Sequence, residues 1–211
     1  MSTYSKDSDV RLIRAARILI PNVGCSGLNL RSVARKAHVN LGMFHYHFRT
    51  KAVFKRRVLE SIYEKFFNDL SRDTTAVHDN MEKLQQSLVT FGRFSRDHRR
   101  LISSLAKDIL GGDQVVIGFM SKNFPRHLEI LLKLIEDCQK EGRIVPLDPS
   151  RVFVFLMSSI NAPHIIAGCI DRLKKPARPH TKSKGRIFTK DLISDEAIVQ
   201  RVKMALKGLT P

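Results

Sequence analysis

The stretch GCSGLNLRSVARKAHVNLGMFHYHFRTK, residues 24–51, decides the fold of this chain. It holds two very short segments with helical periodicity, residues 30–37 and 41–47, and each follows an asparagine that can cap a helix. Asn29 precedes the first segment and Asn40 the second, so the turn between the two is tight. Two short helices joined in this way are typical of a helix-turn-helix, which places its second helix in the major groove of DNA.

The segments outside this stretch also show helical periodicity, while Gly and Pro are sparse and no alternating β pattern occurs. The apolar spacing predicts further helices over residues 9–20, 51–70, 80–96, 98–110, 113–143, 149–170 and 194–208. We expect Pro21 and Gly24 to stop the first of them, and Pro125 to break the helix over 113–143. The sequence therefore predicts an all-α fold, with a three-helix helix-turn-helix DNA-binding domain over residues 1–56. A helical regulatory domain for ligand binding and dimerisation is expected over residues 57–211.

The amino-acid composition of the chain indicates what kind of partner it binds. The chain has 211 residues, 43% of them hydrophobic, which is enough for a buried core. Its 37 Lys and Arg against 20 Asp and Glu give a net charge of +17, so a polyanion is the expected partner. Three widely spaced cysteines favour a reducing compartment over a disulfide scaffold, and we expect a cytoplasmic protein. Of these cysteines, Cys25, Cys138 and Cys169, we expect buried and inert side chains rather than redox sensors.

The segment over residues 149–170 is the most membrane-like part of the chain. It is almost long enough to span a bilayer, but Asn161, Pro163 and His164 interrupt it. A buried helix at a subunit interface explains it better. We therefore expect no membrane partner.

The sequence contains no nucleophile elbow, P-loop, dinucleotide fingerprint, HExxH or paired-carboxylate motif, so we expect no enzyme, no catalytic residues and no cofactor. His45 and His47 could suggest a metal site, but side chains two residues apart on a helix do not face each other. Zinc needs convergent ligands, and no third one is near them in the sequence. The sequence therefore predicts no metal site.

The same stretch resembles the DNA-binding head of the tetracycline-repressor (TetR) family of bacterial transcription regulators. The positions that carry the resemblance are Gly24, Val33, Ala34, Ala37, Val39, Gly42, Phe44, His47, Phe48 and Lys51. Motif-level support covers about residues 10–70, and beyond them the resemblance is one of architecture. It implies a homodimeric repressor that binds a pseudo-palindromic operator in double-stranded DNA and is released by an unidentified small-molecule effector.

The start of the second short helix would face the base edges. Gly42 allows a close approach to the duplex, and Leu41 and Met43 can contact thymine methyl groups. Asn40 can pair with a base or cap the helix, and the cap is favoured. Arg31 can pair with guanine or bind a phosphate, and the two alternatives weigh equally. The residues expected at phosphates are His45, Tyr46, His47, Thr50 and Lys51.

Two positions depart from the family pattern. His38 stands where the turn usually has Gly, and it must tolerate the positive φ that this position often needs. His45 stands where a Tyr is usual, so an imidazole replaces a hydroxyl at the expected phosphate contact. We expect the turn to survive with mild strain.

The resemblance also implies a ligand pocket and a dimer interface. Candidate pocket residues are Phe91, Phe94, Phe119, Phe124, His127 and Met157, with His164 as a further polar group, although aromatic residues at helical spacing are more often plain core. The helices over about 149–170 and 194–208 would pair with those of a second copy in a four-helix bundle. Between them lies a basic loop over 172–190, either a solvated loop or a second polyanion contact. The alternative function is a charge-driven general nucleic-acid-binding protein without an effector.

Overall fold

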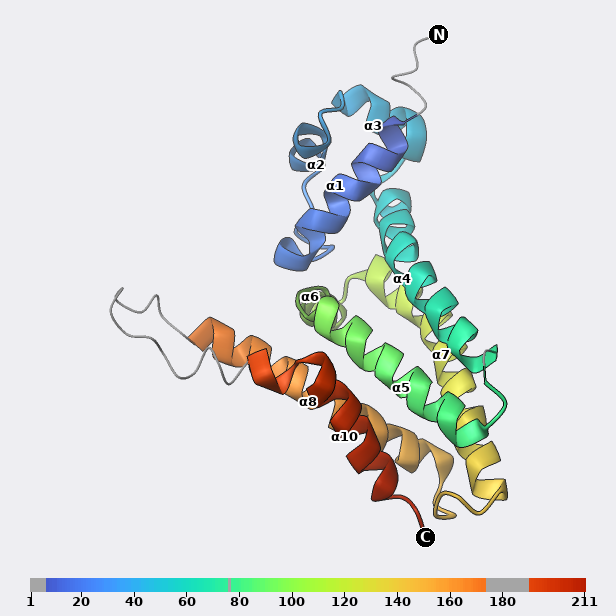
Figure 1. The fold of residues 1–211 in the computed structure, drawn as a ribbon. Coiled ribbons are helices and arrows are strands. Elements are labelled where there is room, and N and C mark those ends of the chain that lie inside the picture. Colours follow the sequence, from blue (N-terminus) through green and yellow to red (C-terminus); the bar gives the residue numbers. More distant parts are fainter. Residues whose placement is uncertain (1–6, 76, 174–189) are drawn as a thin grey trace. The chain divides into compact units, whose positions relative to one another are not determined.

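A computed structural model describes residues 7–75, 77–173 and 190–211, and every regular element assigned in these ranges is a helix (Figure 1). The helices are α1 (Ser8–Val23), α2 (Leu30–Ala37), α3 (Leu41–Phe48), α4 (Lys51–Thr75), α5 (Asn80–Asp97), α6 (Arg99–Leu110), α7 (Gln114–Lys140), α8 (Pro149–Leu173) and α10 (Asp195–Lys207). The predicted all-α fold is confirmed. Most of the basic loop over 172–190 lies outside the described residues.

Polar side chains fix the beginnings of the later helices. Thr50 Oγ1 accepts the backbone N–H of Val53 at the start of α4. Asp148 caps α8, which begins at Pro149, and Ser194 Oγ accepts the N–H of Ala197 in α10. These caps satisfy backbone donors that have no partner inside the helix.

The two predicted proline breaks are wrong. α1 continues through Pro21 to Val23 and ends only at Gly24, whose backbone N–H donates to the Ile20 carbonyl at 2.8 Å. α7 runs without interruption through Pro125. A proline inside a helix removes one backbone donor, and here the packing of the turns on either side holds both helices together despite that loss.

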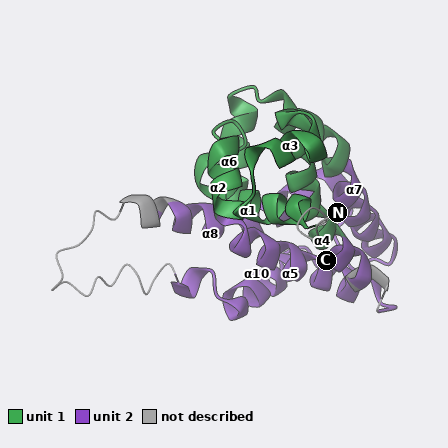
Figure 2. Ribbon diagram, turned by 90° about the horizontal axis from the view of Figure 1, so that it is seen from above, with its two compact units in different colours: residues 1–67, 100–124 green, residues 68–99, 125–211 purple. Residues whose placement is uncertain are grey.

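The chain divides into two compact units (Figure 2). Unit 1 comprises residues 1–67 and 100–124, and unit 2 comprises residues 68–99 and 125–211. Unit 1 is therefore discontinuous in sequence, because α6 and the first half of α7 pack with the first four helices. This is a division by packing, whereas the expected division into residues 1–56 and 57–211 is one by function.

The core of unit 2 lies between α5, α8 and α10, with the second half of α7 beside them. Gly92 on α5 lies at a close approach of the three helices. A Cβ there would lie 2.7 Å from Ile198 Cγ2 of α10 and 3.2 Å from Ile160 Cγ2 of α8. The buried members of this core are Leu84, Leu88, Val89, Leu131, Leu134, Ile135, Cys138, Ile144, Val152, Leu156, Ile160, Ile198, Val202, Ala205, Leu206 and Leu209.

α8 is long and apolar enough over residues 149–168 to cross a membrane, by length and composition alone. One face of it packs into the core of unit 2 through Val152, Leu156 and Ile160. His164 and Ala167 continue the same buried face. One face of the helix is thus buried along its length, while only 33% of this segment is buried overall.

Candidate nucleic-acid interface

The turn between α2 and α3 has the geometry of a helix-turn-helix. Asn29 Oδ1 accepts the backbone N–H groups of Arg31 and Ser32, and Asn40 Oδ1 accepts that of Gly42 at 2.8 Å. His38 has φ 54° and ψ 45°, the left-handed conformation expected for this position. Both asparagines therefore cap their helices, and the turn is kept although a histidine replaces the usual glycine.

An aromatic cluster packs against the buried face of α3. Phe44 and Phe48 are buried on one face of the helix and pack on Phe54 of α4, with ring centroids 5.0 and 4.8 Å from it. Such edge-to-face contacts between buried rings fix the orientation of the helix they carry. Both phenylalanines are core residues and not platforms for stacking bases.

The opposite side of the motif is open to solvent. Tyr46 is 74% exposed, the largest exposed aromatic surface in the described part of the motif. The other expected DNA-contacting residues are exposed (Arg31, Asn40, Gly42, His45, Thr50, Lys51) or half-buried (Leu41, Met43, His47). Gly42 carries no side chain, so backbone is bare at the first turn of α3, where a recognition helix meets base edges.

Three of these expected contacts already have roles inside the protein. Asn40 and Thr50 cap helices, and His47 Nε2 lies 2.6 Å from Ser8 Oγ of α1. A second contact from α1 secures the turn, because Arg11 Nη2 donates to the His38 carbonyl at 3.0 Å. The sequence analysis missed Ser8 and Arg11, since partners 39 and 27 residues apart leave no local pattern.

α6 holds the loop between α1 and α2 through one buried carboxylate. Asp108 Oδ2 accepts the backbone N–H of Cys25 at 2.6 Å, and Oδ1 accepts the hydroxyl of Ser26 at 2.5 Å. Ser104 Oγ, one turn earlier on α6, donates to the Pro21 carbonyl at 3.0 Å. Burial, together with the charge of Asp108, raises the pKa of the Cys25 thiol to about 12. Cys25 is thus a neutral, buried side chain under this loop.

An ion pair joins α4 to the start of α7 within unit 1. Lys55 Nζ lies 3.0 Å from Asp113 Oδ2, and both side chains are largely buried. Asp113 Oδ1 also accepts the backbone N–H groups of Val115 and Val116 at the beginning of α7. Burial acts to raise the pKa of Asp113, but the hydrogen bonds from Lys55, Val116 and Val115 and the charge of Lys55 together outweigh it, and the pKa is lowered. The carboxylate is therefore charged and fully engaged at neutral pH.

The six expected pocket residues are distributed over both units. Phe119 and Phe124 belong to unit 1, where Phe119 packs edge-on against Tyr63 and Phe124 is 40% exposed. In unit 2, the rings of Phe91 and His127 lie 5.9 Å apart and Phe94 contacts His98. Met157 packs against the unit 2 core.

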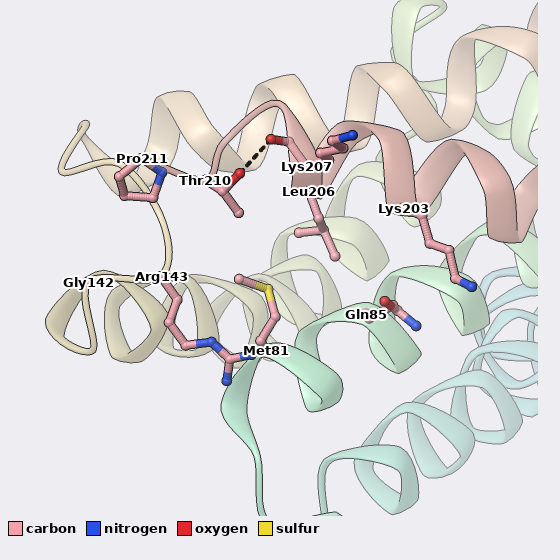
Figure 3. Close-up of a pocket in the computed structure, with 9 residues that line it drawn as sticks. All are labelled: Met81, Gln85, Gly142, Arg143, Lys203, Leu206, Lys207, Thr210 and Pro211. Carbon is pink, nitrogen blue, oxygen red and sulfur yellow. Dashed lines mark hydrogen bonds between the residues drawn. The ribbon is translucent and has the colours of Figure 1, made fainter.

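Two open hollows occur elsewhere in unit 2, and neither is lined by any of those six residues. One, of about 440 Å³, lies between α5, the turn after α7 and the end of α10 (Figure 3). Its lining residues are Met81, Gln85, Gly142, Arg143, Lys203, Leu206, Lys207, Thr210 and Pro211. The other, of about 380 Å³, is lined by Asp191, Leu192, Ala197, Gln200, Arg201 and Met204. Within the described ranges, no three His, Cys, Asp or Glu side chains are placed to hold a metal ion.

A capped two-helix motif on an aromatic core, in a chain whose described elements are all helices, is typical of proteins with an N-terminal helix-turn-helix. No known protein-family profile matches the sequence. The chain is 22% identical over 167 residues to the probable HTH-type transcriptional regulator YttP of Bacillus subtilis, covering 78% of this chain and 79% of that protein.

Solved structures share the fold over nearly the whole chain. A putative fatty acid metabolism regulator of Clostridium perfringens matches with a TM-score of 0.72 and 16% identity, covering 95% of this chain and 99% of that one. The ketosteroid transcriptional regulator KstR2 of Mycobacterium tuberculosis matches with a TM-score of 0.69 and 15% identity, covering 96% of this chain and 95% of that one. A putative TetR-family transcriptional regulator from Rhodococcus sp. matches with a TM-score of 0.66 and 15% identity, covering 98% of this chain and 100% of that one.

These proteins are transcriptional regulators, and several of the structural matches are TetR-family members. The chain has the TetR-family fold. The resemblance indicated by residues 24–51 is thereby confirmed, and it extends well beyond the motif on which it was based.

Proposed function

We propose that this chain is a homodimeric, sequence-specific DNA-binding transcriptional regulator, and that it acts as a repressor released by a small-molecule effector. The main observation in support of the proposal is the structure of α3. It is eight residues long, rests on a buried aromatic cluster and begins at an exposed, capped first turn that carries Gly42. Such a helix fits the major groove, which admits one α-helix. The proposal includes no catalytic activity, cofactor or metal.

The exposed residues divide into two roles. We assign base contacts to Leu41, Gly42 and Met43, and either a base or a phosphate to Arg31. Phosphate contacts fall to His45, Tyr46 and Lys51. The structural bonds of Asn40, His47 and Thr50 make these three primarily positioning residues, which hold α3 and the start of α4 against the backbone of the duplex.

Dimerisation is assigned to α8 and α10. The side of α8 that faces away from the core carries Val154, Phe155, Ile165 and Ile166, each at least 46% exposed, and α10 adds Met204 at 67%. Contiguous exposed apolar side chains on a soluble protein mark an interaction surface. A two-fold copy would cover them, and two heads would meet half-sites one helical turn, roughly 34–36 Å, apart on a pseudo-palindromic operator.

The effector would act by binding one arrangement of the two heads better than the other, which shifts the DNA-bound population by that difference in affinity. We place the protein in the bacterial cytoplasm, on the nucleoid when it is bound to DNA. The likeness to YttP and to the solved regulators supports this placement without identifying an effector.

Fluorescence anisotropy of the full chain tests the proposal, with DNA from upstream of its own gene and scrambled DNA of equal length at about 150 mM salt, where nonspecific contacts are weakened. We expect a preference of about 10³-fold or more for the upstream DNA, or for an operator from a genome-wide binding selection. If the chain binds all DNA sequences equally, including those from the selection, the result would support the alternative of a charge-driven nucleic-acid-binding protein. The net charge of +17 is consistent with that alternative.

Matched variants locate the interface. Lys51→Gln removes a cation at the start of α4, and Lys133→Gln removes an exposed cation from α7. We expect Lys51→Gln to lower the slope of log affinity against log salt by about 1, because one phosphate contact is lost. Lys133→Gln should leave the slope unchanged. Equal slopes for both variants would remove Lys51 from the interface.

A further inference from the structure

Unit 2 contains buried polar atoms that have no hydrogen-bond partner in the described part of the chain. They are both ring nitrogens of His164 on α8, the Oγ atoms of Ser87 and Ser95 on α5 and the Nη1 of Arg201 on α10. His164 is 3% exposed and Ser95 is 2% exposed. Buried polar atoms are nearly always hydrogen-bonded, so three helices contributing unpartnered atoms to one unit is unusual.

The helices that carry the three side chains cross one another. α5, α8 and α10 come close together where Gly92 meets Ile160 and Ile198, and the charge of Arg201 acts on His164. His164 lies one turn after Ile160 and Ser95 one turn after Gly92, so each remains on the face that its helix presents to the crossing. Arg201 follows Ile198 by one turn, and its Nη2 donates to the Leu192 carbonyl, which draws the guanidinium back toward the beginning of α10.

Arg201 lines an open hollow that Asp191 also lines. Arg201 forms no ion pair within the residues that the structure describes, and burial lowers the pKa of its guanidinium. The nearby Arg96 is different, because it pairs with both Asp97 and Asp195. Asp195 also accepts two hydrogen bonds from Arg93, and these hold the pKa of its carboxyl at about 2.

The surroundings of His164 are also cationic. Burial, together with the charges of Arg201, Arg96 and Arg99, lowers the pKa of its imidazole to about 4, while the charge of Asp97 acts in the opposite direction. At neutral pH the ring is therefore uncharged, with one N–H to donate. A region with excess positive charge and unused donors favours an anion.

We propose that Arg201, His164 and Ser95 bind the oxyanion group, carboxylate or phosphate, of a small molecule at the crossing of α5, α8 and α10. Arg201 supplies the charge and the Nη1 donor, and the imidazole N–H and the serine hydroxyl supply two further donors. The planar guanidinium matches the geometry of an oxyanion, which accepts several hydrogen bonds at once. The site goes beyond the proposed function, which assigns no position and no chemistry to an effector, and its test does not depend on DNA binding.

Thermal unfolding of the full chain without DNA tests the site. Sodium chloride at pH 7.5 is replaced, at constant ionic strength, by sodium acetate in one series and by sodium phosphate in another. We expect one of the two oxyanions to raise the Tm by about 2–4 °C over chloride, because a ligand that binds only the folded state stabilises it. The series that gives the rise distinguishes a carboxylate from a phosphate group.

Two substitutions on α10 separate this site from general charge effects. Arg201→Met should abolish the rise, whereas Lys203→Met removes the same charge from an exposed position and should retain it. Ser95→Ala leaves all charges in place and should reduce the rise in Tm. This variant tests the site if Arg201→Met fails to fold. The ¹⁵N resonances of the His164 ring should shift on titration of the wild-type chain with the active anion.

Several results would overturn the proposal. One is a Tm that does not distinguish oxyanions from chloride, since ordered water would then satisfy the buried atoms. A rise that persists in Arg201→Met or is undiminished in Ser95→Ala would exclude the site. A rise lost in Lys203→Met and kept in Arg201→Met would move the anion to the hollow between α5 and α10 shown in Figure 3.

Discussion

Asp108 accepts the backbone N–H of Cys25 at 2.6 Å, across 83 residues of sequence. The contact ties α6 to the loop that leads into the helix-turn-helix. Gly24 stands beside it with φ 73° and ψ 175°, a backbone conformation that is essentially restricted to glycine. The position of α2 therefore depends on one carboxylate from α6 and on a residue without a side chain.

Replacement of Gly24 should show how tight this contact is. A Cβ at this position would lie 2.8 Å from Asp108 Oδ1, so Gly24→Ala adds a clash to the backbone strain. We expect it to lower the free energy of unfolding by about 2–4 kcal/mol in urea titrations. Gly112→Ala is the matched control, because Gly112 also has a positive φ of 79° but no atom within 4 Å of the added Cβ. Equal losses for both variants would mean that the clash contributes nothing.

Removal of the carboxylate itself should affect both stability and DNA binding. Asp108→Ala leaves the buried N–H of Cys25 without an acceptor, which costs about 1–3 kcal/mol. Ser26→Ala removes only the hydroxyl partner and should cost about 1 kcal/mol or less. We expect Asp108→Ala to weaken DNA binding several-fold at a temperature where it remains folded. Unchanged affinity together with lost stability would show that the contact does not position the reading head.

The apolar face of α8 should control assembly. Ile165→Lys places a charge in the proposed interface, so we expect sedimentation velocity to show monomers where the wild-type chain gives dimers. Leu110→Lys provides the comparison, since Leu110 at the end of α6 is 90% exposed. That variant should remain dimeric. Dimers of Ile165→Lys, or monomers of the wild type, would contradict the assignment.

Acid should destabilise the chain through His164. Its pKa is about 4 in the folded state against an ordinary value of 6.5, so between these values the unfolded chain binds a proton that the folded chain does not. Stability is therefore present above pH 6.5 and falls as the pH drops toward 4, by up to about 3 kcal/mol. Urea titrations across this range, in chloride buffer, should give a weaker pH dependence for His164→Leu than for the wild type. Parallel curves would show that His164 titrates normally.

The buried cysteines should resist thiol reagents. Burial raises the pKa of Cys25 to about 12 and that of Cys138 to about 11, so neither forms the reactive thiolate near neutral pH. In a Cys169→Ser background we expect no fast reaction with Ellman's reagent at pH 8 until denaturant is added. A thiol that reacts within seconds in the folded protein would contradict the burial of these side chains.

The local features of the fold were predictable from the sequence, because their causes are local. Asn29 and Asn40 cap helices that begin at the next residue, and the left-handed turn at His38 follows from the spacing between them. The predicted breaks at Pro21 and Pro125 failed because packing that is distant in sequence outweighs the loss of one backbone donor.

The contacts that tie the site together could not be predicted from one sequence. Ser8 with His47, Arg11 with His38, and Asp108 with Cys25 join residues 27 to 83 positions apart. Nothing in the composition around Asp108 sets it apart from other acids on a helix. Its role depends on burial, which becomes visible only once α6 is packed against the loop after α1.

Because unit 1 is discontinuous in sequence, its helix-turn-helix part cannot be exchanged between proteins as one continuous segment. Residues 1–67 on their own would lack Asp108, which holds the α1–α2 loop, and Asp113, the partner of Lys55. The DNA-reading part of this chain is thus no self-contained cassette that recombination could exchange at a single crossover. A chimaera with a foreign regulatory half would have to carry residues 100–124 along, or supply an acid of its own beneath Cys25.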